Sequence, residues 1–217
     1  SMDAAKEVGG DFYDMFMIDD RHVAVVIADV SGKGIPAALV MVVTKTLIKN
    51  HAQLGMEPCE VFTMVNDMLS EDNDVGFFIT SWMGVIDVET GVMKYVNAGH
   101  NPPMITGSDG QVSKLEVLPN LALGVWPDFS FTAQIKDLSA GDRITLYTDG
   151  VTEAEKADGS QYGEQRLCDF LSDNCCETEE NLCTGVLNSL DLYFEGRPQN
   201  DDITLLSLRI RKTNENQ

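Results

Sequence analysis

Aspartates recur in this sequence where apolar, strand-like segments begin or end. Asp11 begins one such segment, Asp29 follows the apolar run 23–28, Asp149 follows a third segment and Asp201 precedes the last. Carboxylates that gather at one edge of a sheet either raise one another's pKa or require a cation. Oxygen ligands from several aspartates suit hard divalent ions such as Mg²⁺ or Mn²⁺. The pattern therefore favours a metal site, although each motif alone is more typical of a turn.

A pair of such ions has a specific use in phosphate chemistry. Two divalent cations about 3.5 to 4 Å apart can lower the pKa of a water and present it in line to a phosphate monoester. No protein nucleophile is then required. The sequence has no G-x-S-x-G elbow, and its cysteines lack the context of a thiol phosphatase.

Four further residues are candidates for supporting roles. Asp14 lies three residues after Asp11, and Asp202 lies one after Asp201. Because side chains alternate between the faces of a strand, we expect both to lie on the face opposite the candidate ligands and to support the site. Lys33 lies in "SGKG", which lacks the spacing of a phosphate-binding P-loop. It could assist a phosphorylated substrate, or it could be a solvated lysine.

His100 is the fourth of these candidates, in the segment "NAGHNPP". A histidine could protonate the leaving group of a phosphoester. The asparagines and prolines around it favour a structural turn instead.

Composition limits the possible partners and location. The formal net charge is −20, and no basic stripe is present to bind a phosphate backbone, so nucleic acid is not expected. No apolar stretch approaches the roughly 18 residues that cross a bilayer. The five cysteines form no C-x-x-C pair, which favours reduced thiols in the cytoplasm.

The domain organisation is expected to be simple. The length of 217 residues favours one domain over residues 1–217, with Ser1 and Met2 as a cloning remnant. Because a crowded motif appears within ten residues of the start, we expect a domain excised from a longer regulatory protein.

The elements that must position these side chains follow from hydrophobic periodicity. Helix-like and strand-like segments alternate in blocks, which predicts an α+β fold built on an antiparallel β-sandwich. Strands are expected at 11–18, 23–30 and 202–210, with a hairpin over 77–98 that turns at 89–91 and a strand over 143–150 that runs into a turn. Helices are expected at 35–54, 57–70, 164–174 and 179–193.

Two of the predicted helices carry detailed expectations. Helix 35–54 has few polar interruptions and is predicted to be largely buried. Helix 57–70 is predicted to pack beside it as a layer. Its apolar face is expected to comprise Val61, Met64, Val65, Met68 and Leu69.

Five motifs occur in an order that resembles a known family. They are "EVGGDFYD", "IADVSGKGIPAALVM", "NAGHNPP", "LYTDGVTEA" and "NDDITLL". Together they resemble the metal-dependent Ser/Thr protein phosphatases (protein phosphatase 2C-like, PPM type), in the bacterial SpoIIE/RsbU-like branch. The resemblance implies a central antiparallel β-sandwich flanked by helices on both sides.

The resemblance also implies a ligand set and a cofactor. Asp11 and Asp29 would hold a metal pair, the backbone carbonyl of Val30 would contribute to one ion, and Asp149 with Asp201 would complete the other shell. Two divalent cations, Mn²⁺ or Mg²⁺, are expected. The wider family has Gly-Asp-Ser near "NAGHNPP" and uses that acid for an additional metal. No acid stands there in this sequence, so a third ion is not expected.

The substrate and partners follow only from the resemblance. It implies a phosphoserine or phosphothreonine protein substrate, of the STAS-like anti-sigma-factor antagonist type, and an upstream sensor or dimerisation domain. Two alternatives stay open. One is a catalytically silent signalling or docking domain of the same fold, and the other is a hydrolase of small phosphoesters.

Overall fold

The chain folds into two compact units, each with its own antiparallel sheet and hydrophobic core. The computed structural model describes residues 1–5, 8–71 and 73–211. Unit 1 comprises Ser1–Ala5, Asn101–Leu115 and Leu138–Gln217, and unit 2 comprises Lys6–His100 and Glu116–Asp137. Antiparallel sheets with separate blocks of helices confirm the predicted α+β class.

Unit 2 contains a sheet with strand order β2-β3-β4-β5-β8. All its neighbouring strands are antiparallel, and the segments of the chain that form them are largely those expected from alternation and β-branching. The strands are β2 (Phe12–Met17), β3 (His22–Val30), β4 (Ile79–Asp87), β5 (Val92–Ala98) and β8 (Gln134–Asp137).

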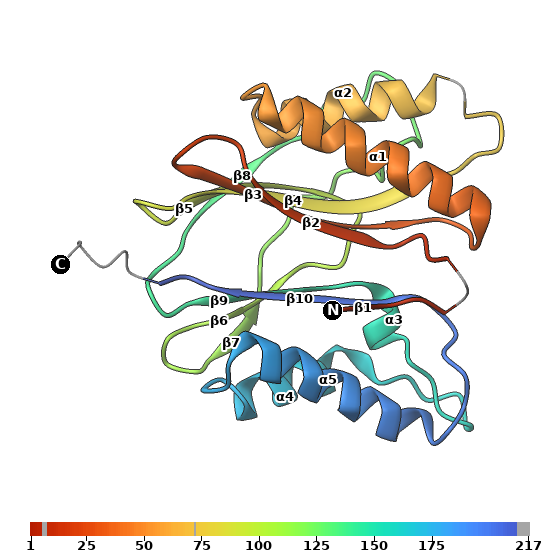
Figure 1. Cartoon of the computed structure of the whole chain (residues 1–217), viewed down its shortest axis with the longest axis vertical. Helices are drawn as coiled ribbons and strands as arrows, with labels where there is room; N and C mark the ends of the chain where they lie inside the picture. The colour runs from red at the N-terminus through yellow and green to blue at the C-terminus, as the bar shows by residue number, and fades with distance from the viewer. Residues whose placement is uncertain (6–7, 72, 212–217) are drawn as a thin grey trace. The chain divides into compact units, whose positions relative to one another are not determined.

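Two helices, α1 (Ile35–Gln53) and α2 (Pro58–Ser70), pack on one face of this sheet, as Figure 1 shows. A proline lies in the first turn of each helix, where its missing N–H costs nothing. Gly55, at a φ of 80°, follows the end of α1. At the start of α2, the Glu60 carboxylate accepts a hydrogen bond of 3.0 Å from the Glu57 N–H.

The prediction that α1 is largely buried is wrong. Ile35 and Leu39 are 69% and 64% exposed, and Val42 and Val43 are also exposed. A helix beside one sheet and one other helix can bury only part of its circumference, however apolar its sequence. The buried residues of α1 are the small or sheet-facing ones, namely Ala37, Ala38, Thr44, Ile48 and Ala52.

The predicted apolar face of α2 needs a smaller correction. Val61 and Val65 are buried as expected, whereas Met64 and Met68 are exposed and Phe62 is buried in their place. Phe62 packs edge-on against Phe131, with 5.9 Å between the ring centroids. Because Phe62 contacts the loop that carries Phe131, the buried face of α2 is shifted around the helix from the predicted one.

Unit 1 contains a second sheet, with strand order β1-β10-β9-β6-β7. Two longer helices, α4 and α5, pack on this sheet, as Figure 1 shows. Their shared core includes Leu167, Val186 and Leu205. The elements are β1 (Met2–Asp3), β6 (Met104–Thr106), β7 (Val112–Lys114), β9 (Arg143–Tyr147), β10 (Ile203–Arg209), α3 (Asp149–Thr152), α4 (Gly163–Asp173) and α5 (Glu179–Phe194).

No helix among the described residues is long and apolar enough to span a membrane.

Candidate metal centre

Asp11 lies opposite Asp29 in the antiparallel register of unit 2. Phe12 pairs with Ala28 and Tyr13 with Ile27, and one further step along the same register aligns Asp11 with Asp29. Opposed residues in such a pair share a face, with Cβ atoms about 4.5 to 5.5 Å apart. Asp11 is 1% exposed. A buried carboxylate beside a second one requires a positive partner or a shared proton.

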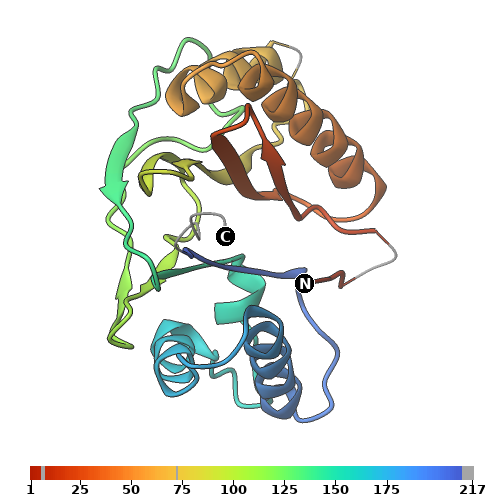
Figure 2. The ribbon, with the colours of Figure 1, turned by 60° about the vertical axis from the view of Figure 1, so that its left-hand side comes forward.

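The two faces of the sheet separate Asp11 from Asp14. Phe12 packs in the core under the helices, and Asp14 lies two residues further along β2 on the same face. The Asp14 carboxylate lies 3.7 Å from Lys49 Nζ and 4.0 Å from Lys45 Nζ, both on α1. Asp14 therefore links β2 to α1, and not to the face that carries Asp11. The ribbon of α1 runs beside β2, as Figure 2 shows.

Gly10 and the Val30 carbonyl are in close contact beside these acids. A Cβ built on Gly10 would lie 3.0 Å from Val30 O and 3.6 Å from the Ala37 Cβ. Only glycine leaves room for the backbone to approach that carbonyl without displacing it. Glu7, at the start of the same motif, lies outside the described residues.

His100 is held by the strand next to Asp29. Asp29 pairs with Thr80 on β4, and the Thr80 hydroxyl lies 2.8 Å from His100 Nδ1. The His100 carbonyl accepts a hydrogen bond of 3.1 Å from the Asn97 side chain. His100 is buried. These contacts are those of an ordered turn, and a role for its ring in proton transfer stays a prediction.

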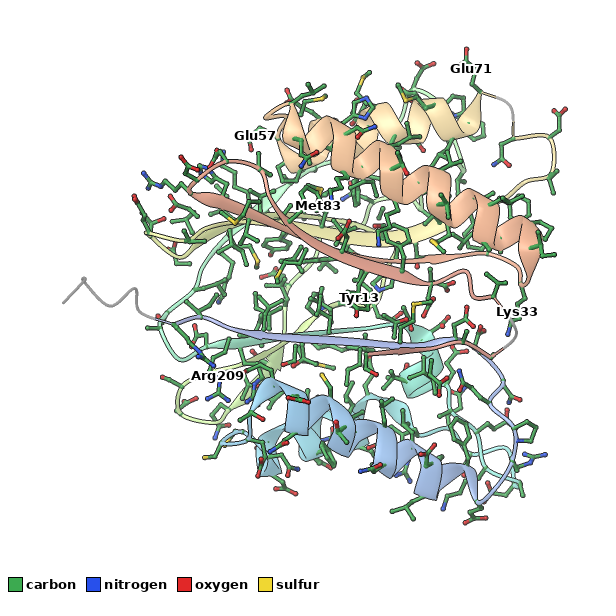
Figure 3. All side chains as sticks on the ribbon, in the orientation of Figure 1. Tyr13, Lys33, Glu57, Glu71, Met83 and Arg209 are labelled. Atoms are coloured by element: carbon green, nitrogen blue, oxygen red, sulfur yellow. The ribbon has the colours of Figure 1, made fainter. Side chains whose placement is uncertain are left out.

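Lys33 is exposed in the turn between β3 and α1, where Figure 3 labels it. The glycines on either side, Gly32 and Gly34, have φ values of 91° and 83°, which side chains rarely adopt. The turn therefore projects Lys33 close to the end of the strand that carries Asp29. Assistance to a phosphorylated substrate stays a prediction.

In unit 1, backbone packing brings together the two segments that carry Asp149 and Asp202. Asp149 begins the short helix α3, so the strand β9 runs into a helical turn. Gly150 approaches Asp202 so closely that a Cβ would overlap the Asp202 carbonyl oxygen. Thr148 donates its N–H to Thr204 O at 3.1 Å, which ties the two segments together.

The neighbouring acids Asp201 and Asp202 have different contacts. Asp201 Oδ1 accepts the N–H of Asp202 at 2.9 Å, and Asp202 Oδ1 accepts the N–H of Ala5 at 2.8 Å. The Asp202 carboxylate thus holds the chain that leaves β1. This contact supports the expectation that Asp202 and Asp201 differ in role, and the ligand role of Asp201 stays a prediction.

The candidate ligands therefore form two sets, one in each unit. Asp11, Asp29 and the Val30 carbonyl belong to unit 2, and Asp149, Asp201 and Asp202 belong to unit 1. Among residues 1–5, 8–71 and 73–211, no three His, Cys, Asp or Glu side chains form a group that could hold a metal ion. The donors in unit 2 are nonetheless all oxygens, and such a set fits Mg²⁺ or Mn²⁺, which keep several waters.

Sequence reasoning missed three residues that contribute to this region. Thr80 lies between Asp29 and His100, but a single threonine within a strand carries no motif. Lys45 and Lys49 fix Asp14, and their spacing of four residues on one helix face was the available signal.

Solved structures of other proteins have this fold. The PP2C phosphatase domain of SpoIIE from Bacillus subtilis, solved with a fragment of its regulatory domain, superposes with a TM-score of 0.84 at 22% identity. The match covers 98% of this chain and 63% of that one. The fold is therefore that of a PP2C-type phosphatase domain.

The sequence also matches a family model and curated proteins. The model of stage II sporulation protein E (SpoIIE) matches residues 19–211. Protein IcfG of Synechocystis and the phosphoserine phosphatase RsbU of Bacillus subtilis are each 31% identical, over 231 and 206 residues, and each match covers 94% of this chain. The chain spans 36% of IcfG and 60% of RsbU. The chain belongs to the SpoIIE family.

Proposed function

We propose that this chain is a Mn²⁺- or Mg²⁺-dependent protein phosphatase that hydrolyses phosphoserine or phosphothreonine in bacterial signalling, in the cytoplasm. The observation that carries the proposal is the register of Asp11 against Asp29, which sets a buried carboxylate opposite a second one. Membership of the SpoIIE family supports the reaction class. The name of its relative RsbU, a phosphoserine phosphatase, supports the substrate class.

We propose two divalent cations as the cofactor. The proposed ligands in unit 2 are Asp11, Asp29 and the Val30 carbonyl, and the proposed ligands in unit 1 are Asp149 and Asp201. When bound, the cations supply a water that is activated near neutral pH and neutralise charge on the phosphoryl oxygens. The chain's own residues orient the site: Gly10 admits the Val30 carbonyl, and Gly150 allows Asp149 to lie against the segment of Asp202.

The reaction can be tested with an aryl phosphate, which has no protein surface. We expect hydrolysis with Mn²⁺ or Mg²⁺, none with a chelator, and a loss of at least about 100-fold in Asp29→Asn and Asp149→Asn. Asp20→Asn, at an exposed acid in the turn after β2, is the matched control. Turnover that persists in chelator, or full activity in both site variants, would overturn the mechanism.

A second measurement separates the alternatives for the substrate. We propose a phosphorylated STAS-like anti-sigma-factor antagonist as the substrate. A panel should therefore compare such a protein, phosphorylated on serine, with small phosphorylated metabolites. A preference for the metabolites would favour a small-phosphoester hydrolase. Binding of the phosphoprotein without turnover under any metal condition would favour a silent docking domain.

The exposed apolar stripe on α1 supports a regulatory partner. Ile35, Leu39, Val42 and Val43 recur at the spacing of one helix face and are exposed in this chain. The curated relatives extend well beyond the matched length. We propose that a sensor or dimerisation segment of the longer protein covers this stripe. Leu39→Glu should then abolish regulation in the longer protein, whereas aryl phosphate hydrolysis by this chain should change by less than about twofold.

A further inference from the structure

A second group of exposed apolar side chains lies on two loops of unit 2. One loop precedes β4 and the other precedes β8. Single exposed apolar residues are common on protein surfaces, but a group that includes a largely exposed tryptophan is not. Trp126 is 67% exposed. We call the group the loop patch, and it consists of Val75, Phe78, Leu121, Val125 and Trp126.

The two loops are fastened to each other. Ile79 and Leu123 exchange both backbone hydrogen bonds, at 2.9 and 2.8 Å. The Asn73 side chain donates to Gly124 O at 3.0 Å, and its own carbonyl accepts the Phe77 N–H at 2.9 Å. The loop patch is therefore held in place before any partner arrives, which lowers the entropic cost of binding.

A buried asparagine on α2 fixes the tryptophan itself. The Asn66 side chain donates to Trp126 O at 2.9 Å and accepts the Gly124 N–H at 3.0 Å. Asn66 is buried, so these bonds compete little with water. The backbone of Trp126 is thus anchored while its indole remains exposed.

The loop patch adjoins the end of the sheet that carries the candidate ligands. Ser31 follows Val30 directly, and its N–H donates to Phe78 O at 2.9 Å while its hydroxyl accepts the Phe78 N–H at 2.9 Å. On the other loop, the Ala122 backbone N lies 3.5 Å from the position of a Cβ on Gly99, next to His100. Both loops are therefore in direct contact with segments that border Asp29.

We propose that the loop patch is the docking surface for the folded phosphoprotein substrate, an inference that rests on the proposed function. A phosphate monoester is the same group in every substrate, so discrimination needs contacts outside the metal centre. The chain carries a formal charge of −20, and a phosphoprotein adds negative charge of its own. The net charges of the two proteins therefore provide no attraction, and an uncharged apolar patch with an exposed tryptophan supplies short-range binding energy outside the metal centre.

The chain offers a direct reporter of docking. Trp126 and Trp82 are its two tryptophans, and Trp82 is 0% exposed. We expect the fluorescence of Asp29→Asn to change on titration with a serine-phosphorylated STAS-domain protein, because burial alters the environment of Trp126. The change should be absent in Asp29→Asn/Trp126→Phe. Since Asp29→Asn is designed not to turn over, this measurement reports binding independently of catalysis.

Steady-state kinetics provide a second test of the docking proposal. The ratio of kcat/KM for the phosphoprotein to kcat/KM for an aryl phosphate should fall at least about tenfold in Trp126→Ser and in Phe78→Ser. Ile135→Ser is the matched control, since Ile135 is 67% exposed on β8 of the same unit. Thermal unfolding should show that all three variants are folded.

The outcomes are distinct. An unchanged ratio in both loop-patch variants, or a fall equal to that of Ile135→Ser, overturns the docking proposal. So does a change of oligomeric state in Trp126→Ser without a change of the ratio, which would assign the loop patch to a second copy of the chain. If the parent chain hydrolyses no phosphoester but the Trp126 signal persists, the proposed reaction fails and docking stands.

Discussion

Asp11 and Asp29 face each other across the β2–β3 pair, on the side of the sheet opposite α1 and α2. Asp14, only three residues from Asp11, points to the helix side and contacts Lys45 and Lys49. Two acids in one short motif thus have different partners, and this difference can be measured.

The first prediction compares these two acids. Asp11→Asn should weaken Mn²⁺ binding at least about tenfold, because it removes a charged oxygen ligand from the proposed site. Asp14→Asn should change Mn²⁺ binding by less than about twofold and should cost below about 1 kcal/mol of unfolding free energy, as expected for partly exposed ion pairs. Calorimetric titration and chemical unfolding measure the two quantities. Equal losses of metal affinity would contradict the assignment of faces.

The second prediction concerns the contact between Gly10 and the Val30 carbonyl. Gly10→Ala brings a Cβ to 3.0 Å from that oxygen, so the carbonyl must shift by a few tenths of an ångström. We expect the half-saturating Mn²⁺ concentration to rise several-fold, with a loss of unfolding free energy of no more than about 1 kcal/mol. The double variant Gly10→Ala/Ala37→Gly is the control, because it removes the contact at 3.6 Å between the added Cβ and the Ala37 Cβ. Full recovery of metal affinity in the double variant would place the cause at Ala37.

The third prediction concerns Gly150. An alanine there overlaps the Asp202 carbonyl, so the chain must separate two segments that flank candidate ligands. Gly150→Ala should cost about 1 to 3 kcal/mol of unfolding free energy, as overpacking does. Gly196→Ala is the comparison for backbone strain alone, since φ is 81° there and no atom lies within 4 Å of the added Cβ. An unfolding free energy of Gly150→Ala equal to that of the parent chain would show that the contact relaxes freely.

The fourth prediction concerns pH and an ion pair at the opposite end of β3. The Arg21 guanidinium, 2.5 Å from Asp87, holds the pKa of that carboxyl well below its usual range. A carboxyl whose pKa is lower in the folded state stabilises the fold fully at pH values above its unfolded-state pKa, which is about 4. This stabilisation is lost as the pH falls from there through the folded-state pKa. Asp87→Asn should therefore lower the unfolding free energy at pH 7, with the difference from the parent chain shrinking below about pH 4. A difference independent of pH between 7 and 3 would refute the linkage.

Much of the local structure could be predicted because it depends on neighbouring residues. Pro36 and Gly55 bracket α1, and β-branched residues mark β3. The alternation of side chains along a strand was enough to separate Asp14 from Asp11. Family membership was also predictable, because five ordered motifs carry it.

The exposure of α1 could not be predicted in the same way. Its sequence is apolar around most of the helix, so periodicity alone does not indicate which residues the sheet covers. The loop patch was equally unforeseen. Asn66 and Asn73 are ordinary polar residues in the sequence, and their role in fixing Trp126 and Gly124 exists only because α2 and two loops meet.

The sequence by itself determined the elements, the family and the identity of the acids at strand ends, because these depend on residue type and short-range spacing. The tertiary structure decided which acids face each other, since the β2–β3 register aligns Asp11 with Asp29. It also decided that Gly150 lies against Asp202, a contact between residues far apart in the chain. Such contacts arise from packing many segments at once, so a local pattern cannot encode them.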